Sequence, residues 1–161
     1  MKIRLLLVCM IFICPLLSFA EDTTSISYPY FRLLKMDSVH YLTQKDLPAH
    51  KNTVFINFSP TCEHCQRTIG DILKNIEKFK ETQFVLSSFE VFNAIKQFHT
   101  DYKLEKYPTI FIGQEQNFEL THKLNYSSFP CSILFDQNNK YILKIEGEAK
   151  SKEYLRLLKL K

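Results

Sequence analysis

The sequence predicts an α/β domain in which helices flank a central mixed β-sheet. Short runs of β-branched and aromatic residues alternate with segments whose apolar residues recur every three or four positions. Two strand-like runs joined by a short turn then follow, and a final helix-like segment closes the chain. The order strand–helix–strand–helix, then hairpin, then helix is typical of a mixed sheet that is covered on both faces.

The first twenty residues have the features of a signal peptide. Lys2 and Arg4 give a charged start, residues 5–17 are apolar and uncharged, and residues 18–20 include the small side chains that a signal peptidase reads. We therefore expect cleavage before Glu21 and export, to the periplasm if the host is Gram-negative. The alternative is an N-terminal membrane anchor, since about 18 apolar residues can just span a bilayer.

Composition limits the function of the remaining 141 residues. Loss of Lys2 and Arg4 lowers the formal net charge from +4 to +2. A charge this small gives no large basic surface of the kind that binds nucleic acid. No second long apolar run occurs, so we expect membrane association only if the leader is retained. We expect residues 21–29 to be a flexible lead-in and residues 30–161 to form one domain.

The first half of the domain begins with a predicted hairpin. Residues 31–36 and 39–42 flank Asp37 and Ser38 and have the pattern of two short strands. Residues 53–58 are almost wholly apolar, as a central buried strand requires. A helix is predicted within residues 66–80 because apolar side chains form one face there: Ile69, Ile72, Leu73, Ile76 and Phe79.

A second strand and helix follow in the middle of the chain. Residues 83–86 read as the next strand, and an apolar stripe that begins at Phe92 predicts a helix ending near Tyr102. Residues 109–112 form another short strand, and we expect an irregular stretch from there to Ser128.

The C-terminal third predicts two strands and a helix. Residues 131–135 and 141–145 flank a turn at residues 137–139, which is rich in Asn and Gln. Residues 151–160 have helical spacing, and Ser151 is a plausible N-cap because its hydroxyl can accept a backbone hydrogen bond.

A Cys-x-x-Cys motif lies between the central strand and the helix that follows it. Cys62 and Cys65 stand three positions apart at a predicted helix start, where the helix dipole stabilises a thiolate. Cys62 comes first, so we expect it to attack, and Cys65, one turn inward, to be the resolving thiol. A cationic His64 would favour the Cys62 thiolate, while the Glu63 carboxylate would oppose it.

Structural and metal-binding readings of this motif remain as alternatives. An inert bridge needs only the two cysteines, whereas a zinc site would need two further ligands, and no second Cys-x-x-Cys or His-x-x-x-His occurs. A copper- or zinc-handling module could use Cys62, Cys65 and a histidine such as His122. A thiol peroxidase is disfavoured, because the proline and threonine that such sites require are not at the needed offsets.

The chain resembles thioredoxin-like thiol–disulfide oxidoreductases, most closely the exported TlpA/ResA type. Residues 58–65 resemble the active-site turn of that family and residues 87–90 the end of its second strand. Phe129-Pro130 and residues 131–140 resemble its cis-proline segment, and Gly147 matches a glycine near its active site. The likeness covers residues 30–160 and includes an insertion before the cis-proline strand.

The resemblance implies a redox-active Cys62–Cys65 disulfide with no bound cofactor. It also implies partner proteins that carry disulfides or dithiols, an electron-donating membrane reductase, and a role in redox homeostasis of the exported compartment. Pro60, Glu63, His64, Phe129 and Pro130 would support the site. Pro108 competes for the role of the cis-proline. The strand, turn, strand, glycine and helix that should follow a cis-proline are found after Pro130.

Three positions depart from the family pattern. Thr61 stands where an aromatic residue usually precedes the first cysteine, and Asn57 occupies the place of a buried acid. Phe129 is bulkier than the usual residue before the cis-proline, which could narrow the choice of substrate. Cys131 follows Pro130 directly and is either a buried structural residue or a third redox or metal-binding thiol. The sequence leaves the direction of electron flow open.

Overall fold

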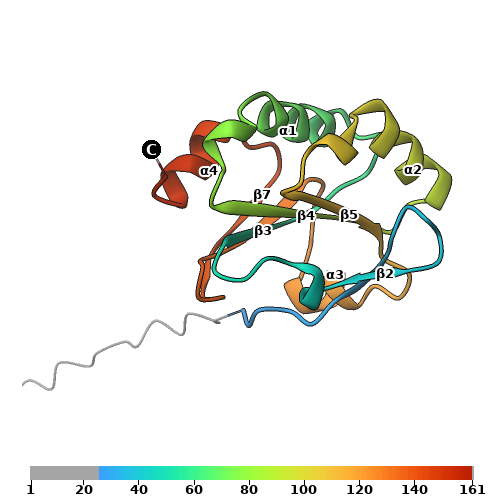
Figure 1. The fold of residues 1–161 in the computed structure, drawn as a ribbon, viewed down its shortest axis with the longest axis horizontal. Coiled ribbons are helices and arrows are strands. Elements are labelled where there is room, and N and C mark those ends of the chain that lie inside the picture. Colours follow the sequence, from blue (N-terminus) through green and yellow to red (C-terminus); the bar gives the residue numbers. More distant parts are fainter. Residues whose placement is uncertain (1–25, 161) are drawn as a thin grey trace, which may run out of the picture.

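Seven strands form one mixed sheet in the computed structural model, which describes residues 26–160 (Figure 1). The strand order is β2-β1-β5-β4-β3-β6-β7. Helices cover both faces of this sheet, so the predicted α/β class with a central mixed sheet is confirmed. The predicted signal peptide, residues 1–20, lies outside the described residues.

The three central strands run parallel and are buried. They are β3 (Asn52–Asn57), β4 (Thr82–Ser88) and β5 (Ile110–Gln114). β3 pairs with β4 in register from Asn52 opposite Thr82 to Asn57 opposite Ser87. Strands that are covered on both faces need a nearly continuous apolar run, and this is the pattern that predicted them.

Four antiparallel strands extend the sheet at its two edges. They are β1 (Arg32–Leu34), β2 (Tyr41–Thr43), β6 (Cys131–Phe135) and β7 (Tyr141–Glu146). The predicted N-terminal hairpin is therefore β1 and β2. Its turn is held by the Asp37 carboxylate, whose Oδ1 accepts the N–H groups of Val39 and His40 at 2.9 Å each.

Three helices lie on one face of the sheet and one lies on the other (Figure 1). α1 (Glu63–Lys74), α2 (Phe92–Asp101) and α4 (Ser151–Leu157) share the first face, and α3 (Glu119–Leu124) covers the second. Short 3-10 turns follow three of the elements, at Gln44–Asp46, Ile76–Lys78 and Leu104–Lys106. None of the helices among residues 26–160 has the length and apolar character needed to cross a membrane.

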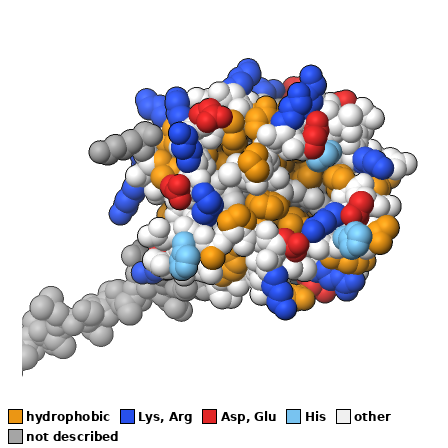
Figure 2. Space-filling view, viewed as in Figure 1, with side chains coloured by type: hydrophobic (Ala, Val, Ile, Leu, Met, Phe, Trp, Pro, Cys, Tyr) orange, Lys and Arg blue, Asp and Glu red, His pale blue; other side chains and the backbone are white. Residues whose placement is uncertain are grey.

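A separate apolar core fills each side of the sheet. Val54 and Ile56 of β3 contribute to the core beneath α1, α2 and α4, while Phe55 points to the core on the α3 side. This alternation is expected because successive side chains of a strand point to opposite faces. On the surface seen in Figure 2, basic and acidic side chains are interspersed rather than gathered by sign.

The structure corrects two helix predictions. α1 begins at Glu63, as expected for cysteines at a helix start, but it ends at Lys74 with a 3-10 turn after it rather than continuing to residue 80. The stretch expected to be irregular contains α3, which is only six residues long and is flanked by Phe118 and Asn125 in the left-handed conformation. No side chain caps the start of α3 at its N-cap position, so the local sequence offers no start signal.

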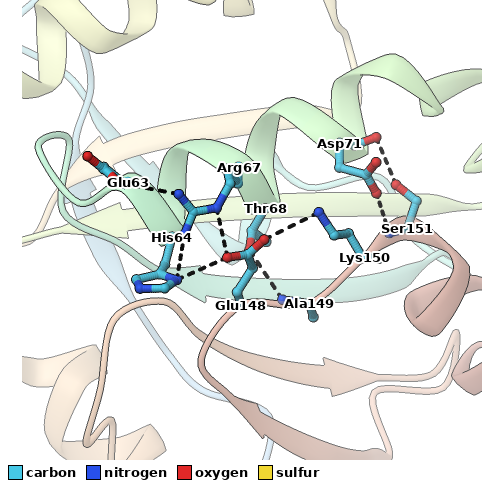
Figure 3. Close-up of polar contacts among 9 residues, drawn as sticks. All are labelled: Glu63, His64, Arg67, Thr68, Asp71, Glu148, Ala149, Lys150 and Ser151. Carbon is cyan, nitrogen blue, oxygen red and sulfur yellow. Dashed lines mark hydrogen bonds and ion pairs between the residues drawn. The ribbon is translucent and has the colours of Figure 1, made fainter.

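The start of α4 is capped by another helix. Lys150 is the N-cap residue, and the predicted cap, Ser151, is the first helical residue. The Asp71 carboxylate of α1 accepts the Ser151 N–H at 2.6 Å, and the Ser151 hydroxyl donates to the Asp71 carbonyl at 2.8 Å (Figure 3). These bonds lower the pKa of Asp71 and fasten α4 to the middle of α1.

Residues 26–29, the described part of the expected lead-in, form no helix or strand, but they pack against the sheet. The ring of Tyr28 lies edge-to-face with Phe55 and Phe135, at centroid distances of 5.5 and 5.0 Å. Its hydroxyl donates to Thr53 at 3.3 Å. Residues 26–29 therefore lie against the sheet rather than hanging free of it.

Candidate active site

The two cysteines of the motif lie where the chain leaves β3 and enters α1. Cys62 is the N-cap residue of α1, and its N–H donates to the carbonyl of Ser59 at 3.1 Å. The side-chain amide of Gln66 donates to the backbone carbonyl of Pro60 at 2.8 Å. The Ser59 hydroxyl donates to Glu90, beyond the end of β4, at 3.0 Å. The turn is therefore held from both sides, and Pro60, which is buried, forms part of it.

Burial distinguishes the two thiols. Cys62 is half-buried, whereas Cys65 is wholly buried in the core beneath α1, and both are free thiols in this structure. Burial, with a smaller contribution from the neighbouring Cys62, raises the pKa of Cys65 to about 12. Cys62 is thus the sulfur that a partner can reach, and Cys65 remains protonated until its surroundings change.

The peptide bond between Phe129 and Pro130 is cis, and it is the one cis bond within residues 26–160. The Cys62 thiol lies 3.9 Å from the Phe129 carbonyl oxygen, so this loop meets the dithiol. The Gly147 N–H donates to the Pro130 carbonyl at 2.8 Å, and its φ of +86° is one that glycine adopts freely. Pro130, and not Pro108, therefore lies beside the cysteines.

A charged cluster ties α1 to the segment after β7 (Figure 3). The Glu148 carboxylate accepts Arg67 Nε at 2.9 Å and Lys150 Nζ at 3.3 Å, and its Oε2 lies 3.0 Å from His64 Nδ1. The bonds from His64 and Arg67 lower the pKa of Glu148 to about 2. Arg67 also reaches Glu63 at 3.3 Å, so the Glu63 charge has a cationic partner.

His64 Nδ1 faces two groups that require opposite protonation states. Arg67 Nη2 lies 2.8 Å from this nitrogen and can donate to it only when it carries no proton. Glu148 can accept from the same nitrogen only when it is protonated. His64 Nδ1 therefore has a partner whether or not it carries a proton: Glu148 accepts from it in the first case, and Arg67 donates to it in the second.

Asn57 and Cys131 lie on the opposite face of the sheet from Cys65. They are paired across β3 and β6, so their side chains share one face, and that face is the one covered by α3. Burial raises the pKa of Cys131 to about 11. The geometry favours the structural interpretation of Cys131 over a third redox thiol, because the sheet separates it from the dithiol.

The histidine expected in a metal-handling module is not near the cysteines. His122 belongs to α3, on the face opposite α1. Within the described part of the chain, no group of three or more His, Cys, Asp or Glu side chains is arranged to hold a metal ion. The structure therefore does not bring together the ligand set of Cys62, Cys65 and His122.

Comparison of the sequence with known families identifies one match. The sequence model of the thioredoxin-like domain matches residues 42–161. Comparison with curated proteins finds no match.

Solved structures share the fold at low sequence identity. A thiol:disulfide interchange protein of the thioredoxin family from Chlorobium tepidum is 17% identical, with a TM-score of 0.68 over 86% of this chain and 97% of that one. A secreted disulfide oxidoreductase from Mycobacterium tuberculosis is 12% identical, with a TM-score of 0.67 over 81% and 95%. StoA from Bacillus subtilis is 12% identical, with a TM-score of 0.63 over 82% and 98%.

The difference in burial predicts selective alkylation. When the reduced native protein is exposed briefly to iodoacetamide at pH 7.5, we expect a single label on Cys62, because only the accessible thiol can form a reactive thiolate. Mass spectrometry of the digested protein identifies which cysteines carry the label. The control is urea-unfolded protein, in which Cys65 and Cys131 should be labelled as well. Equal labelling of Cys62 and Cys65 in the native protein would contradict the assignment.

The lowered pKa of Glu148 predicts a pH-dependent contribution to stability. A carboxyl group whose folded pKa is depressed stabilises the fold above its unfolded pKa, near 4.5, and this stabilisation disappears as the pH falls toward 2. We expect Glu148→Gln to lower the melting temperature at pH 7, and the difference from wild type to vanish by pH 2. The control is Glu105→Gln, which alters an exposed side chain. A Glu148→Gln difference that is constant with pH would contradict the role of this carboxylate.

Proposed function

Since the chain belongs to the thioredoxin-like domain family, we propose that it is a thiol–disulfide oxidoreductase that reduces or exchanges disulfides in partner proteins. One observation carries the proposal: a half-buried thiol at the start of α1 lies 3.9 Å from the carbonyl before the cis-proline, with a buried thiol three residues on. An inert structural pair would not need one accessible sulfur beside a free backbone edge.

The reaction consists of two thiol–disulfide exchanges. The Cys62 thiolate attacks one sulfur of the partner's disulfide, a Cys62–partner bond forms, and the other partner sulfur leaves as a thiolate and takes up a proton. Cys65 then loses its proton and attacks the Cys62 sulfur, which releases the second partner thiol. The partner gains two electrons and two protons, and Cys62–Cys65 becomes the disulfide.

The second exchange requires a proton acceptor for Cys65. Burial raises the pKa of this thiol to about 12, and Asn57, expected in the place of a buried acid, has its side chain on the other face of the sheet and cannot titrate. We assign the acceptor role to the departing partner thiolate. This assignment makes resolution of the mixed disulfide the slower of the two exchanges.

The loop around the cis bond would hold the partner chain. β6 begins at Cys131, so the backbone of Phe129 lies beyond its pairing with β3. An extended partner segment can add alongside this backbone and align its disulfide with Cys62. Phe129 and Pro130 would therefore position the partner, while Glu63 and His64 set the charge around the dithiol.

We further propose that the protein is exported and belongs to the TlpA/ResA type. The support is the leader-like sequence of residues 1–20 and the motif order from Cys62 to Gly147. On this view a membrane reductase supplies the two electrons that reduce the Cys62–Cys65 disulfide back to a dithiol.

The pairing of Glu63 with Arg67 offsets the negative charge that would oppose the Cys62 thiolate.

The proposal predicts that a single substitution traps the partner. In Cys65→Ser the first exchange proceeds and the second cannot, so a mixed disulfide through Cys62 should accumulate. The measurement is the mass of the product after incubation with a disulfide-bridged peptide. Cys62→Ser is the matched control and should form no adduct, and Cys131→Ser should behave as wild type. Failure of Cys65→Ser to form an adduct would sink the proposal.

A further inference from the structure

A cavity of about 300 Å³ lies on the α3 side of the sheet, next to the cis-proline loop. Three aromatic rings form one side of it: Phe89 lies between Phe118 and Phe129, at centroid distances of 5.0 and 5.4 Å. Its size is at the lower end of the roughly 300–1,000 Å³ of ordinary ligand pockets. It suits one side chain better than a cofactor.

Polar atoms without partners line the same cavity. Asn57 Oδ1, the Tyr126 hydroxyl and the Ser128 hydroxyl are buried and find no hydrogen-bond partner among the described residues. Asn57 is only 2% exposed. Burial raises the pKa of Tyr126, against a smaller lowering by the nearby Ser87 hydroxyl, which is itself without a hydrogen-bond partner within residues 26–160, so the Tyr126 hydroxyl stays protonated and can donate. Leaving such groups unpaired destabilises a fold, because each has lost its hydrogen bonds to water without replacement. A cluster of them at one cavity therefore indicates a site that is completed by a ligand.

The walls of the cavity are held in place before anything binds. The buried Glu115 carboxylate accepts the Thr121 N–H at 2.8 Å and the Thr121 hydroxyl at 2.6 Å, which fixes the first turn of α3. Lys144 of β7 donates to the carbonyl of Asn125 at 2.6 Å and to the Ser127 hydroxyl at 3.3 Å. The loop that follows α3 is thus anchored to β7.

Phe129 connects this cavity to the dithiol. Its carbonyl lies beside Cys62 and its ring lines the cavity. Successive side chains of an extended chain point in opposite directions. A partner strand laid along Phe129 with its cysteine toward Cys62 therefore directs the next side chain to the α3 side, where the cavity lies.

We propose that the cavity receives the side chain next to the partner's reactive cysteine and selects an aromatic side chain with a hydrogen-bonding tip, namely tyrosine. The three rings match the apolar body of a tyrosine, and its hydroxyl can donate to Asn57 and accept from both Tyr126 and Ser128. This inference rests on the proposed oxidoreductase function and specifies the class of its partners.

The test uses the Cys65→Ser variant and three peptides of the form X-Cys-X, in which X is Tyr, Phe or Ala. Each peptide cysteine carries a thionitrobenzoate group through a disulfide, so attack by Cys62 on the peptide sulfur releases the chromophore as its thiolate. The rate of this release gives the second-order rate constant for each peptide. We expect the tyrosine peptide to react about tenfold faster than the phenylalanine peptide, and the alanine peptide to be slowest.

Removal of a cavity hydroxyl should abolish this discrimination. In the Cys65→Ser background, Tyr126→Phe should bring the ratio of the Tyr and Phe rate constants close to one and leave the alanine peptide unchanged. Ser128→Ala is the second variant, in case Tyr126→Phe does not fold. Tyr41→Phe removes a hydroxyl from β2, outside the cavity, and should keep the wild-type ratio.

The outcomes separate this inference from the function on which it rests. Normal release with equal rates for all three peptides would overturn the tyrosine site and leave the oxidoreductase proposal standing. A tenfold preference that persists in Tyr126→Phe and in Ser128→Ala would also overturn the assignment to this cavity. No release with any peptide would overturn both proposals.

Discussion

The structure depends on how the first turn of α1 packs over the end of β3. This packing buries Cys65 completely in the core and leaves Cys62 half-exposed at the helix N-terminus. Burial raises the pKa of the inner thiol, while the outer thiol stays within reach of a partner at the helix start. From these different surroundings we propose different roles for two chemically identical side chains, attacker for Cys62 and resolver for Cys65.

Segments far from the motif in sequence complete the site. The cis Phe129–Pro130 loop places a carbonyl beside Cys62, and the Gly147 N–H holds that loop by bonding to Pro130. The next residue, Glu148, binds Arg67 of α1 and lies within hydrogen-bond distance of His64. The segment directly after β7 therefore contacts both the cis-proline loop and α1.

Patterns within short segments could be predicted from the sequence, while contacts across the fold could not. Buried strands and the dithiol helix follow from local composition and order, and the cis bond at Pro130 follows from the family resemblance. α3 was missed because it is only six residues long, and the side chain that fixes its first turn, Glu115, precedes the helix rather than capping it. The cap of α4 comes from Asp71, eighty residues earlier in the chain. The cavity beside Phe129 likewise brings together strand, loop and helix residues that have no common motif.

The most direct test of the central claim is a redox titration of the protein in thiol–disulfide buffers, with alkylated cysteines counted by mass at each potential. The account predicts one reversible two-electron transition that is confined to Cys62 and Cys65 and is unchanged in Cys131→Ser. Its midpoint would also assign the direction of electron flow, because a low potential marks a reductase and a high one a disulfide donor. A pair that never forms a disulfide, or that instead retains a stoichiometric metal ion, would contradict the account.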